Sequence, residues 1–298
     1  MVSRRSTGAD GADDADGIGA RPRTLPLRSP RVLMYHFFGE PPGQGDPERL
    51  FVTAAGLHAQ LDRLRRWGWQ PLDLDGYLAA LDGKPVPRRS FLLTIDDGHA
   101  SVVDVAAPAL AAAGVPSVLF VCPALLGGTS RWSCFYPTEP LAPAERLADL
   151  PGLGMELGLH GLDHTRLTDV DDAALPDHVV GARDALLVAT GARARAFAYP
   201  YGTHDERACR AVAVAGYAVA FAVAREGGRY AADRIFVRGD ESTLVFRWKL
   251  TAAYRLVSRA AGRIRRLRRA VRIAVWTLRG VKPLSQPPPT SQPERKAE

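Results

Sequence analysis

Two adjacent aspartates and a pair of histidines have the residue types and the spacing of a metal-dependent hydrolytic site. Asp96 and Asp97 are consecutive, so their side chains leave the chain in different directions, and one can bind a metal while the other faces substrate. His160 and His164 are four residues apart, which predicts both imidazoles on one side of a helical turn. Two histidines and one carboxylate, with positions left open for water, are typical of a catalytic metal site. A metal held there lowers the pKa of its water and polarises a carbonyl oxygen.

Each of these patterns also has a purely structural interpretation. Asp96-Asp97-Gly98 is typical of a turn or a helix N-cap, and His160 and His164 can be unrelated surface histidines. Pro200-Tyr201-Gly202 is a tight turn that can aim a backbone N–H at a developing oxyanion, but it is equally typical of a packed turn. No single pattern therefore decides the chemistry.

Short apolar runs alternate with helical periodicity along the chain, and these elements would position the polar residues. Strands are predicted at 31–36, 90–95, 115–121, 154–159, 194–199 and 218–222, and helices at 54–67, 103–113, 179–189 and 209–215. This alternation is typical of parallel βαβ units in an open sheet or a barrel. Polar residues follow four of the strands, and the carboxyl ends of parallel barrel strands meet on one face. We therefore expect His36, Asp96, His160 and Pro200 to lie near one another.

Composition and charge exclude several classes of protein. The chain has 298 residues, of which 46% are hydrophobic and 24% charged, as expected for one large α/β domain or two small ones. Its three cysteines exclude a disulfide scaffold, and no apolar run is long enough for a membrane-spanning helix. Residues 241–298 hold 14 of the 39 basic and 3 of the 32 acidic residues, which leaves 25 basic and 29 acidic residues in 1–240. Because the body is mildly acidic, we expect no nucleic-acid partner.

Three motifs, taken together and in order, resemble the polysaccharide deacetylases, also called the NodB-homology or carbohydrate esterase family 4 domain. They are Thr94-Ile95-Asp96-Asp97-Gly98, the His160/His164 pair, and Tyr199-Pro200-Tyr201-Gly202. The resemblance covers about residues 31–240. It implies an α/β fold, a distorted (β/α)7 barrel, and a divalent metal ion, with zinc first and cobalt or nickel as alternatives. The implied reaction is hydrolysis of an acetyl group, N-acetyl before O-acetyl, on a glycan or glycolipid.

Carried over residue by residue, the resemblance implies Asp96 as the general base that activates water at the metal. It implies Asp97, His160 and His164 as the metal ligands, and the Tyr201 backbone N–H as the oxyanion donor. The residues expected to contact substrate are Pro200, Gly202, Trp132 and Tyr136. The last two belong to the loop 127–143, whose aromatic residues are explained equally well by packing within the loop.

The chain departs from the commonest family pattern at two functional positions. Ala198 stands where an arginine usually orients the base, and no histidine follows His204 to supply the usual acid. The Phe-Ala-Tyr-Pro form and the early Met34-Tyr35-His36 are similar to the biofilm-polysaccharide deacetylase branch, in which the motifs are circularly rearranged and the early histidine is the acid. We therefore expect His36 to be the acid, although a histidine that merely ends a strand fits as well. Arg238 is our candidate for the missing orienting arginine.

The two ends of the chain are expected to lie outside the catalytic domain. Residues 1–30 have no apolar periodicity and no signal-peptide core, and 283–298 are rich in Pro, Ser and Gln, so both are predicted to be disordered. Residues 241–282 form a basic helical extension in which apolar residues recur at steps of three and four over 247–279. Such a helix can lie on an anionic membrane, bind polyanions or pack on its own barrel. We expect a cytoplasmic protein, at the inner membrane face if the helix binds lipid; the oligomeric state stays undetermined.

Two alternatives to a glycan deacetylase stay open. One is a catalytically silent glycan-binding barrel, which the missing arginine and late histidine favour. The other is a metal amidohydrolase that acts on a non-carbohydrate amide.

Overall fold

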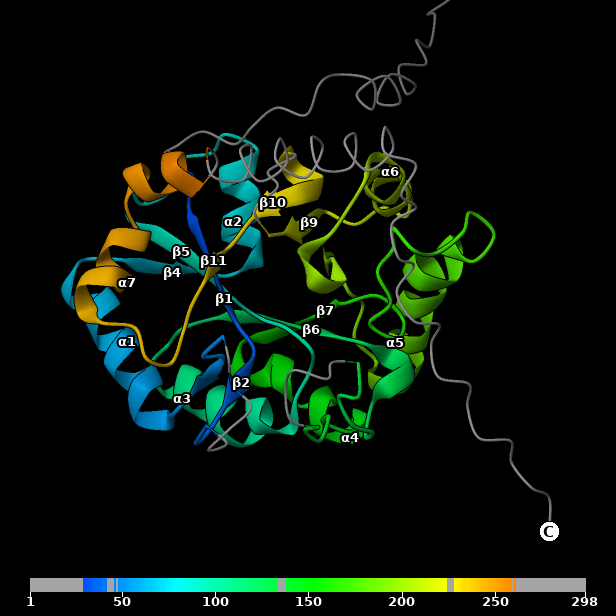
Figure 1. Cartoon of the computed structure of the whole chain (residues 1–298), viewed down its shortest axis with the longest axis horizontal. Coiled ribbons are helices and arrows are strands. Elements are labelled where there is room, and N and C mark those ends of the chain that lie inside the picture. Colours follow the sequence, from blue (N-terminus) through cyan, green and yellow to red (C-terminus); the bar gives the residue numbers. More distant parts are fainter. Residues whose placement is uncertain are drawn as a thin grey trace, which may run out of the picture.

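Parallel strands follow one another around a barrel whose outer surface is covered by helices (Figure 1). The computed structural model describes residues 29–41, 46, 48–132, 138–223, 228–258 and 260. In hydrogen-bonded order the strands are β10 (Ala232–Asp233), β9 (Val219–Ala222), β8 (Ala196–Ala198), β7 (Met155–Leu159), β6 (Ser117–Val121), β5 (Ser90–Ile95), β1 (Arg31–Tyr35) and β11 (Ile235–Phe236). Strand β4 (Gln70–Leu72) also pairs with β5, and β2 (Phe37–Phe38) pairs with β3 (Phe51–Val52) as a separate ribbon. The predicted barrel class is confirmed.

The connections between strands carry the helices that wrap the barrel. They are α1 (Ala54–Arg66), α2 (Leu74–Leu81), α3 (Ala107–Ala112), α4 (Ala144–Ala148), α5 (Ala182–Thr190), α6 (Glu206–Val214) and α7 (Thr243–Lys249). Helices α3 and α5 each continue from a π-helical turn, Val102–Ala106 and Asp177–Gly181 respectively. Helix α1 illustrates the local cause: the Thr53 hydroxyl caps its first turn by accepting from Gly56 N–H, and the leucines at helical spacing are buried.

Side chains on the strands alternate between the barrel interior and the layer under the helices. Val32, Leu92, Val118, Phe120 and Phe221 belong to an interior cluster that also takes in Leu74 and Tyr77 of α2. The intervening strand residues pack with α1, α3, α5 and α6 in the larger cluster. Because a strand repeats every two residues, Thr94 and Asp96 face the same interior as Leu92.

The chain itself joins the two ends of the barrel sheet. Strand β10 pairs with β9 at one end of the hydrogen-bonded path and β11 pairs with β1 at the other. Only Arg234 separates β10 from β11 in the sequence, and its side chain is buried. An arginine at this seam therefore lies inside the barrel.

The predicted strands and helices are present with small shifts at their ends. The strand predicted at 115–121 begins at Ser117, that at 194–199 is confined to Ala196–Ala198, and the helix predicted at 209–215 already begins at Glu206. The short strands β2, β3, β4, β10 and β11 were not predicted, because two or three residues are too few to show periodicity. Among the described helices, none is long and apolar enough to cross a membrane. Residues 1–28 and 283–298, and most of the basic extension, lie outside the described residues.

Candidate active site

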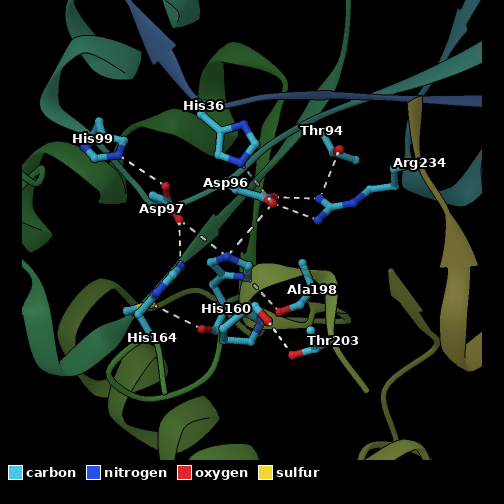
Figure 2. Close-up of polar contacts among 12 residues, drawn as sticks. His36, Thr94, Asp96, Asp97, His99, His160, His164, Ala198, Thr203 and Arg234 are labelled. Atoms are coloured by element: carbon cyan, nitrogen blue, oxygen red, sulfur yellow. Dashed lines mark hydrogen bonds and ion pairs between the residues drawn. The ribbon is translucent and has the colours of Figure 1, made fainter. Parts of the chain in front are cut away.

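The two aspartates at the carboxyl end of β5 point to different partners, as Figure 2 shows. Both side chains are buried. Asp97 has a φ of 76° and Gly98 one of 78°, both left-handed, so the chain turns sharply directly after Asp96. A Cβ at Gly98 would lie 2.8 Å from Val121 Cγ1, so only glycine fits against β6 here. This turn separates the directions of the two carboxylates, as expected from the sequence.

Asp97, His160 and His164 form a buried group that could hold a metal ion. Their ligand atoms all lie within 4.8 Å of one another. The Nε2 atoms of His160 and His164 are 3.4 and 3.2 Å from Asp97 Oδ1, an oxygen that has no hydrogen-bond partner within the described part of the chain. His160 Nδ1 lies 2.8 Å from the Ala198 carbonyl oxygen, so we assign the ring proton to Nδ1, which leaves the Nε2 lone pair free for a metal. An orphaned carboxylate oxygen faced by two imidazole nitrogens fits a divalent cation with nitrogen and oxygen ligands.

The two histidines do not lie on a helical turn, so that part of the prediction is wrong. The residues after β7 form a loop of bends, in which Gly161 has a φ of 76° and His164 one of 66°. The left-handed His164 turns its ring back toward His160, with 5.0 Å between the ring centroids. Loop geometry, not helical spacing, therefore brings the two imidazoles together.

Burial and charge act in opposite directions on the two carboxylates. Burial favours the protonated form of Asp97, but the imidazoles of His160, His164 and His99 around its carboxylate outweigh burial and hold its pKa well below the ordinary value. Burial likewise opposes ionisation of Asp96, and the nearby Arg234 guanidinium reverses the balance and lowers the pKa of its carboxyl. Both aspartates are therefore ionised near neutral pH.

Arg234, at the seam of the barrel, is the partner of Asp96. Its Nη1 and Nη2 donate to Asp96 Oδ1 and Oδ2 at 2.6 and 2.7 Å. This bidentate pair fixes the plane of the carboxylate. The proposal that Arg238 orients the base is wrong, because the Arg238 side chain is exposed at the surface. The one sequence signal for Arg234 was a charged residue between two short apolar runs, where burial demands a partner.

His36 lies on the other side of Asp96, at the end of β1. Its Nε2 is 3.9 Å from Asp96 Oδ2 and its ring is 5.6 Å from that of Phe236. The side chain is 16% exposed, so it lines the site rather than the core. Burial lowers the pKa of His36, and the charges of Asp97 and Asp96 oppose this only in part.

Aromatic residues of the turn after β8 and of the loop after β6 pack beside the metal-ligand group, which consists of Asp97, His160 and His164. Pro200 and Gly202 are buried, while Tyr201 is 42% exposed with a φ of 58°. The Trp132 ring stacks on His164 at 4.3 Å between centroids, and Tyr201 OH donates to the Trp132 carbonyl oxygen at 3.2 Å. Trp132 is thus brought to the site, whereas Tyr136 lies outside the described residues.

Backbone strain is concentrated at this site. Among the described residues other than glycine, those with positive φ are Arg49, Asp97, His164 and Tyr201. Three of these four belong to the residues predicted to act in catalysis or metal binding. Left-handed residues with side chains cost energy and cluster at functional sites, where the surrounding structure holds them.

His99 is a further buried residue of the site to which the sequence assigned no role. Its Nε2 lies 3.3 Å from Asp97 Oδ2, the oxygen that faces away from the two metal-ligand histidines (Figure 2). A histidine two residues beyond a metal-ligand aspartate was the only sequence signal.

Comparisons with known proteins agree with the motifs and the fold. Residues 83–220 match the family model described as polysaccharide deacetylase. The structure is similar to that of the deacetylase PplD from Streptococcus pyogenes, with a TM-score of 0.63, 19% identity, and coverage of 74% of this chain and 96% of that one. It is similar to IcaB from Ammonifex degensii, with a TM-score of 0.62, 22% identity, and coverage of 75% and 98%. It is also similar to the BpsB deacetylase domain from Bordetella bronchiseptica, with a TM-score of 0.57, 21% identity, and coverage of 73% and 98%.

No curated protein matched the chain. At these identities the structural likeness establishes the shared fold alone, and the family model covers the aspartate and histidine motifs within residues 83–220. The match to a polysaccharide deacetylase domain supports the predicted class of enzyme, a hydrolase of carbon–nitrogen bonds other than peptide bonds. The motifs, the barrel and the match over 83–220 together identify a polysaccharide deacetylase domain in this chain.

Proposed function

We propose that this protein removes acetyl groups, N-acetyl before O-acetyl, from a glycan or glycoconjugate. The observation that carries the proposal is the juxtaposition of Asp96 with the Asp97/His160/His164 group. Asp96 Oδ2 lies 3.9 Å from His160 Nε2, so a water molecule held by that group would be within reach of a second, ionised carboxylate. Deacetylation of an amide needs this arrangement, because water must lose a proton as it attacks the carbonyl carbon.

The metal-ligand group would consist of Asp97, His160 and His164. A divalent ion bound there, zinc first, would acidify water and polarise the acetyl carbonyl oxygen.

The remaining steps fall to the residues around that group. Asp96, held by Arg234, accepts the proton of the attacking water, because its lowered pKa keeps it ionised. The Tyr201 N–H, in the turn after β8, stabilises the charge that develops on the carbonyl oxygen. His36, on the opposite side of Asp96, delivers a proton to the leaving amine, so that acetate and a free amine are released.

Arg234 weakens the case for a catalytically silent binding protein. That alternative rested on the missing orienting arginine and the missing late histidine. Arg234 makes the ion pair with Asp96 that the missing arginine would make. His36 lies beside Asp96, in a position suited to the acid that the missing histidine would supply. A hydrolase acting on a non-carbohydrate amide is distinguished by substrate, so a simple aryl acetamide belongs in the assay beside the sugars.

The deciding experiment measures acetate release from N-acetylglucosamine oligomers with added zinc or cobalt. Asp96→Asn should lower kcat by about 100- to 10,000-fold, the usual contribution of a general base, while the metal stays bound. His160→Ala should lose the metal, and His36→Ala should retain the metal but lose turnover. Metal content is measured on the same preparations by atomic emission.

Surface residues offer a matched control. Asp62→Asn changes an exposed aspartate of α1 that pairs only with Arg65 among the described residues, and it should leave kcat unchanged. Full activity in Asp96→Asn would overturn the proposed mechanism. Acetate release from the aryl acetamide but not from the sugars would replace the glycan with another substrate class.

A further inference from the structure

Asp97 uses its two carboxylate oxygens for different partners. Oδ1 faces His160 and His164 at 3.4 and 3.2 Å, whereas Oδ2 faces His99 Nε2 at 3.3 Å. Among the described residues, the group of atoms close enough to share one metal contains Asp97, His160 and His164 but not His99. His99 therefore approaches Asp97 from the side opposite the metal-ligand group, as Figure 2 shows.

The His99 ring has little freedom to move. It is 1% exposed and packs against Phe37 of β2, with 4.1 Å between the ring centroids, while Phe37 in turn stacks on Phe51 at 4.6 Å. The ring of Trp132, which stacks on His164, has its centroid 6.2 Å from that of His99. The backbone of His99 is also tied, through a β-bridge to Leu141. Rotamers locked by packing in this way hold a hydrogen-bond donor in one direction.

The two nitrogens of His99 indicate which one carries the proton. Nδ1 is buried and finds no hydrogen-bond partner among the residues that the structure describes, while Nε2 faces a carboxylate oxygen. A neutral ring with its proton on Nε2 satisfies the Asp97 oxygen, and the alternative tautomer would place two acceptors against each other. We assign the proton to Nε2 on that ground.

We propose that His99 is a positioning residue, which donates from Nε2 to Asp97 Oδ2 and so presents Oδ1 to the metal. The need for such a residue follows from the backbone, because Asp97 sits in a left-handed conformation with a φ of 76° directly before Gly98. Partners that orient metal ligands commonly contribute about 10- to 100-fold to metal affinity. The inference rests on the metal site of the proposed function and adds a residue to it.

The test measures zinc affinity of the metal-free full chain by competition with a chromophoric chelator. His99→Phe fills the aromatic pocket but removes the donor, and it should weaken zinc binding by about 10- to 100-fold. His99→Gln places an amide N–H near the position of Nε2 and should recover most of that loss. His58→Phe, an exposed histidine on α1, is the matched control and should bind zinc as tightly as the wild type. The circular dichroism and melting temperature of the metal-free variants report whether the barrel is intact.

The outcomes separate the inference from the proposed function. If wild-type and His99→Phe proteins bind zinc equally, the positioning role is overturned while the metal-dependent mechanism stands. If His99→Gln binds zinc as weakly as His99→Phe, a restored donor does not restore the site, and the positioning role is again overturned. If the wild type binds no zinc, cobalt or nickel, the metal site and this inference fail together. Should His99→Phe not fold, His99→Leu, which also lacks the donor, takes its place in the same comparison.

Discussion

The carboxylate of Asp96 pairs with Arg234, a residue 138 positions further along the chain. A buried carboxylate without such a partner would favour its protonated form, and a protonated aspartate cannot act as a base. Arg234 supplies both charge and direction, because its two donors meet the two oxygens of the carboxylate. The residue that makes Asp96 a competent base is thus remote from the motif that identifies it.

Arg234→Met should lower kcat by about 100-fold, because the base loses the contacts that align it. The pH dependence should move as well. Asp96 acts in its ionised form, so activity is lost as the pH falls through its pKa, which Arg234 lowers. Without the guanidinium that pKa rises, and the acidic limb of the kcat/KM profile should shift to higher pH. Steady-state kinetics from pH 4 to 8 checks this shift.

Arg238→Met is the control for that measurement, since Arg238 is exposed and lies four residues from Arg234. It should keep the wild-type rate and pH profile. An acidic limb that stays in place in Arg234→Met would mean that the ion pair does not determine the protonation of Asp96.

At the scale of elements, the packing of β7 against β6 holds the Phe120 ring in place beside Arg234. Phe120 of β6 is fully buried, and the Arg234 guanidinium carbon lies 5.7 Å from the centre of its ring. Gly158 of β7 faces the same ring: a Cβ there would lie 2.5 Å from Phe120 Cε1 and 3.1 Å from the Ala196 carbonyl oxygen. Only a strand without a side chain at this point can pack against Phe120.

Gly158→Ala should therefore destabilise the protein by about 1–3 kcal/mol through overpacking, and should displace Phe120 beneath Arg234. Urea unfolding followed by circular dichroism measures the stability. Gly152→Ala is the matched control, because a Cβ at Gly152 meets nothing within 4 Å, and it should be neutral. Equal stability of the two variants would show that Phe120 can move aside without cost.

At the scale of the whole molecule, the first residues of the basic C-terminal extension pack against the barrel. Phe246 and Leu250 are buried, and Arg31 Nε donates to the Leu250 carbonyl oxygen at 2.9 Å. The outer side of the same segment exposes Leu244, Trp248, Leu256 and Val257. Residues 259–282 then contain nine basic and no acidic residues. Apolar side chains next to concentrated positive charge are suited to an anionic lipid surface.

We expect the full chain to sediment with vesicles that contain phosphatidylglycerol and to stay in solution with pure phosphatidylcholine. Each basic residue near an anionic surface contributes about 1 kcal/mol, and the effect is screened by salt. A chain ending at Ala260 should lose the interaction but keep its fold, because it retains Leu250 and the buried Arg255. Equal sedimentation of the shortened and full chains would exclude the extension as the lipid contact.

The sequence by itself determined the resemblance to polysaccharide deacetylases, the order of strands and helices, and the residues at the strand ends. The alternation of apolar runs with helical periodicity is a local property of the chain, so it can be recognised without the structure. The aspartate and histidine motifs lie at the ends of those apolar runs. Asp96, His160 and Tyr201 could therefore be named in advance.

Only the tertiary structure decided how these residues are held. Arg234 reaches Asp96 because β10 and β11 bring the end of the chain back to β1, and no local pattern shows where a barrel closes. His164 meets His160 through a left-handed loop rather than a helical turn, and His99 meets the second oxygen of Asp97 because Phe37 holds its ring. The sequence shows which side chains could act in the site. Which of them pair with one another depends on contacts between segments that are far apart in the chain.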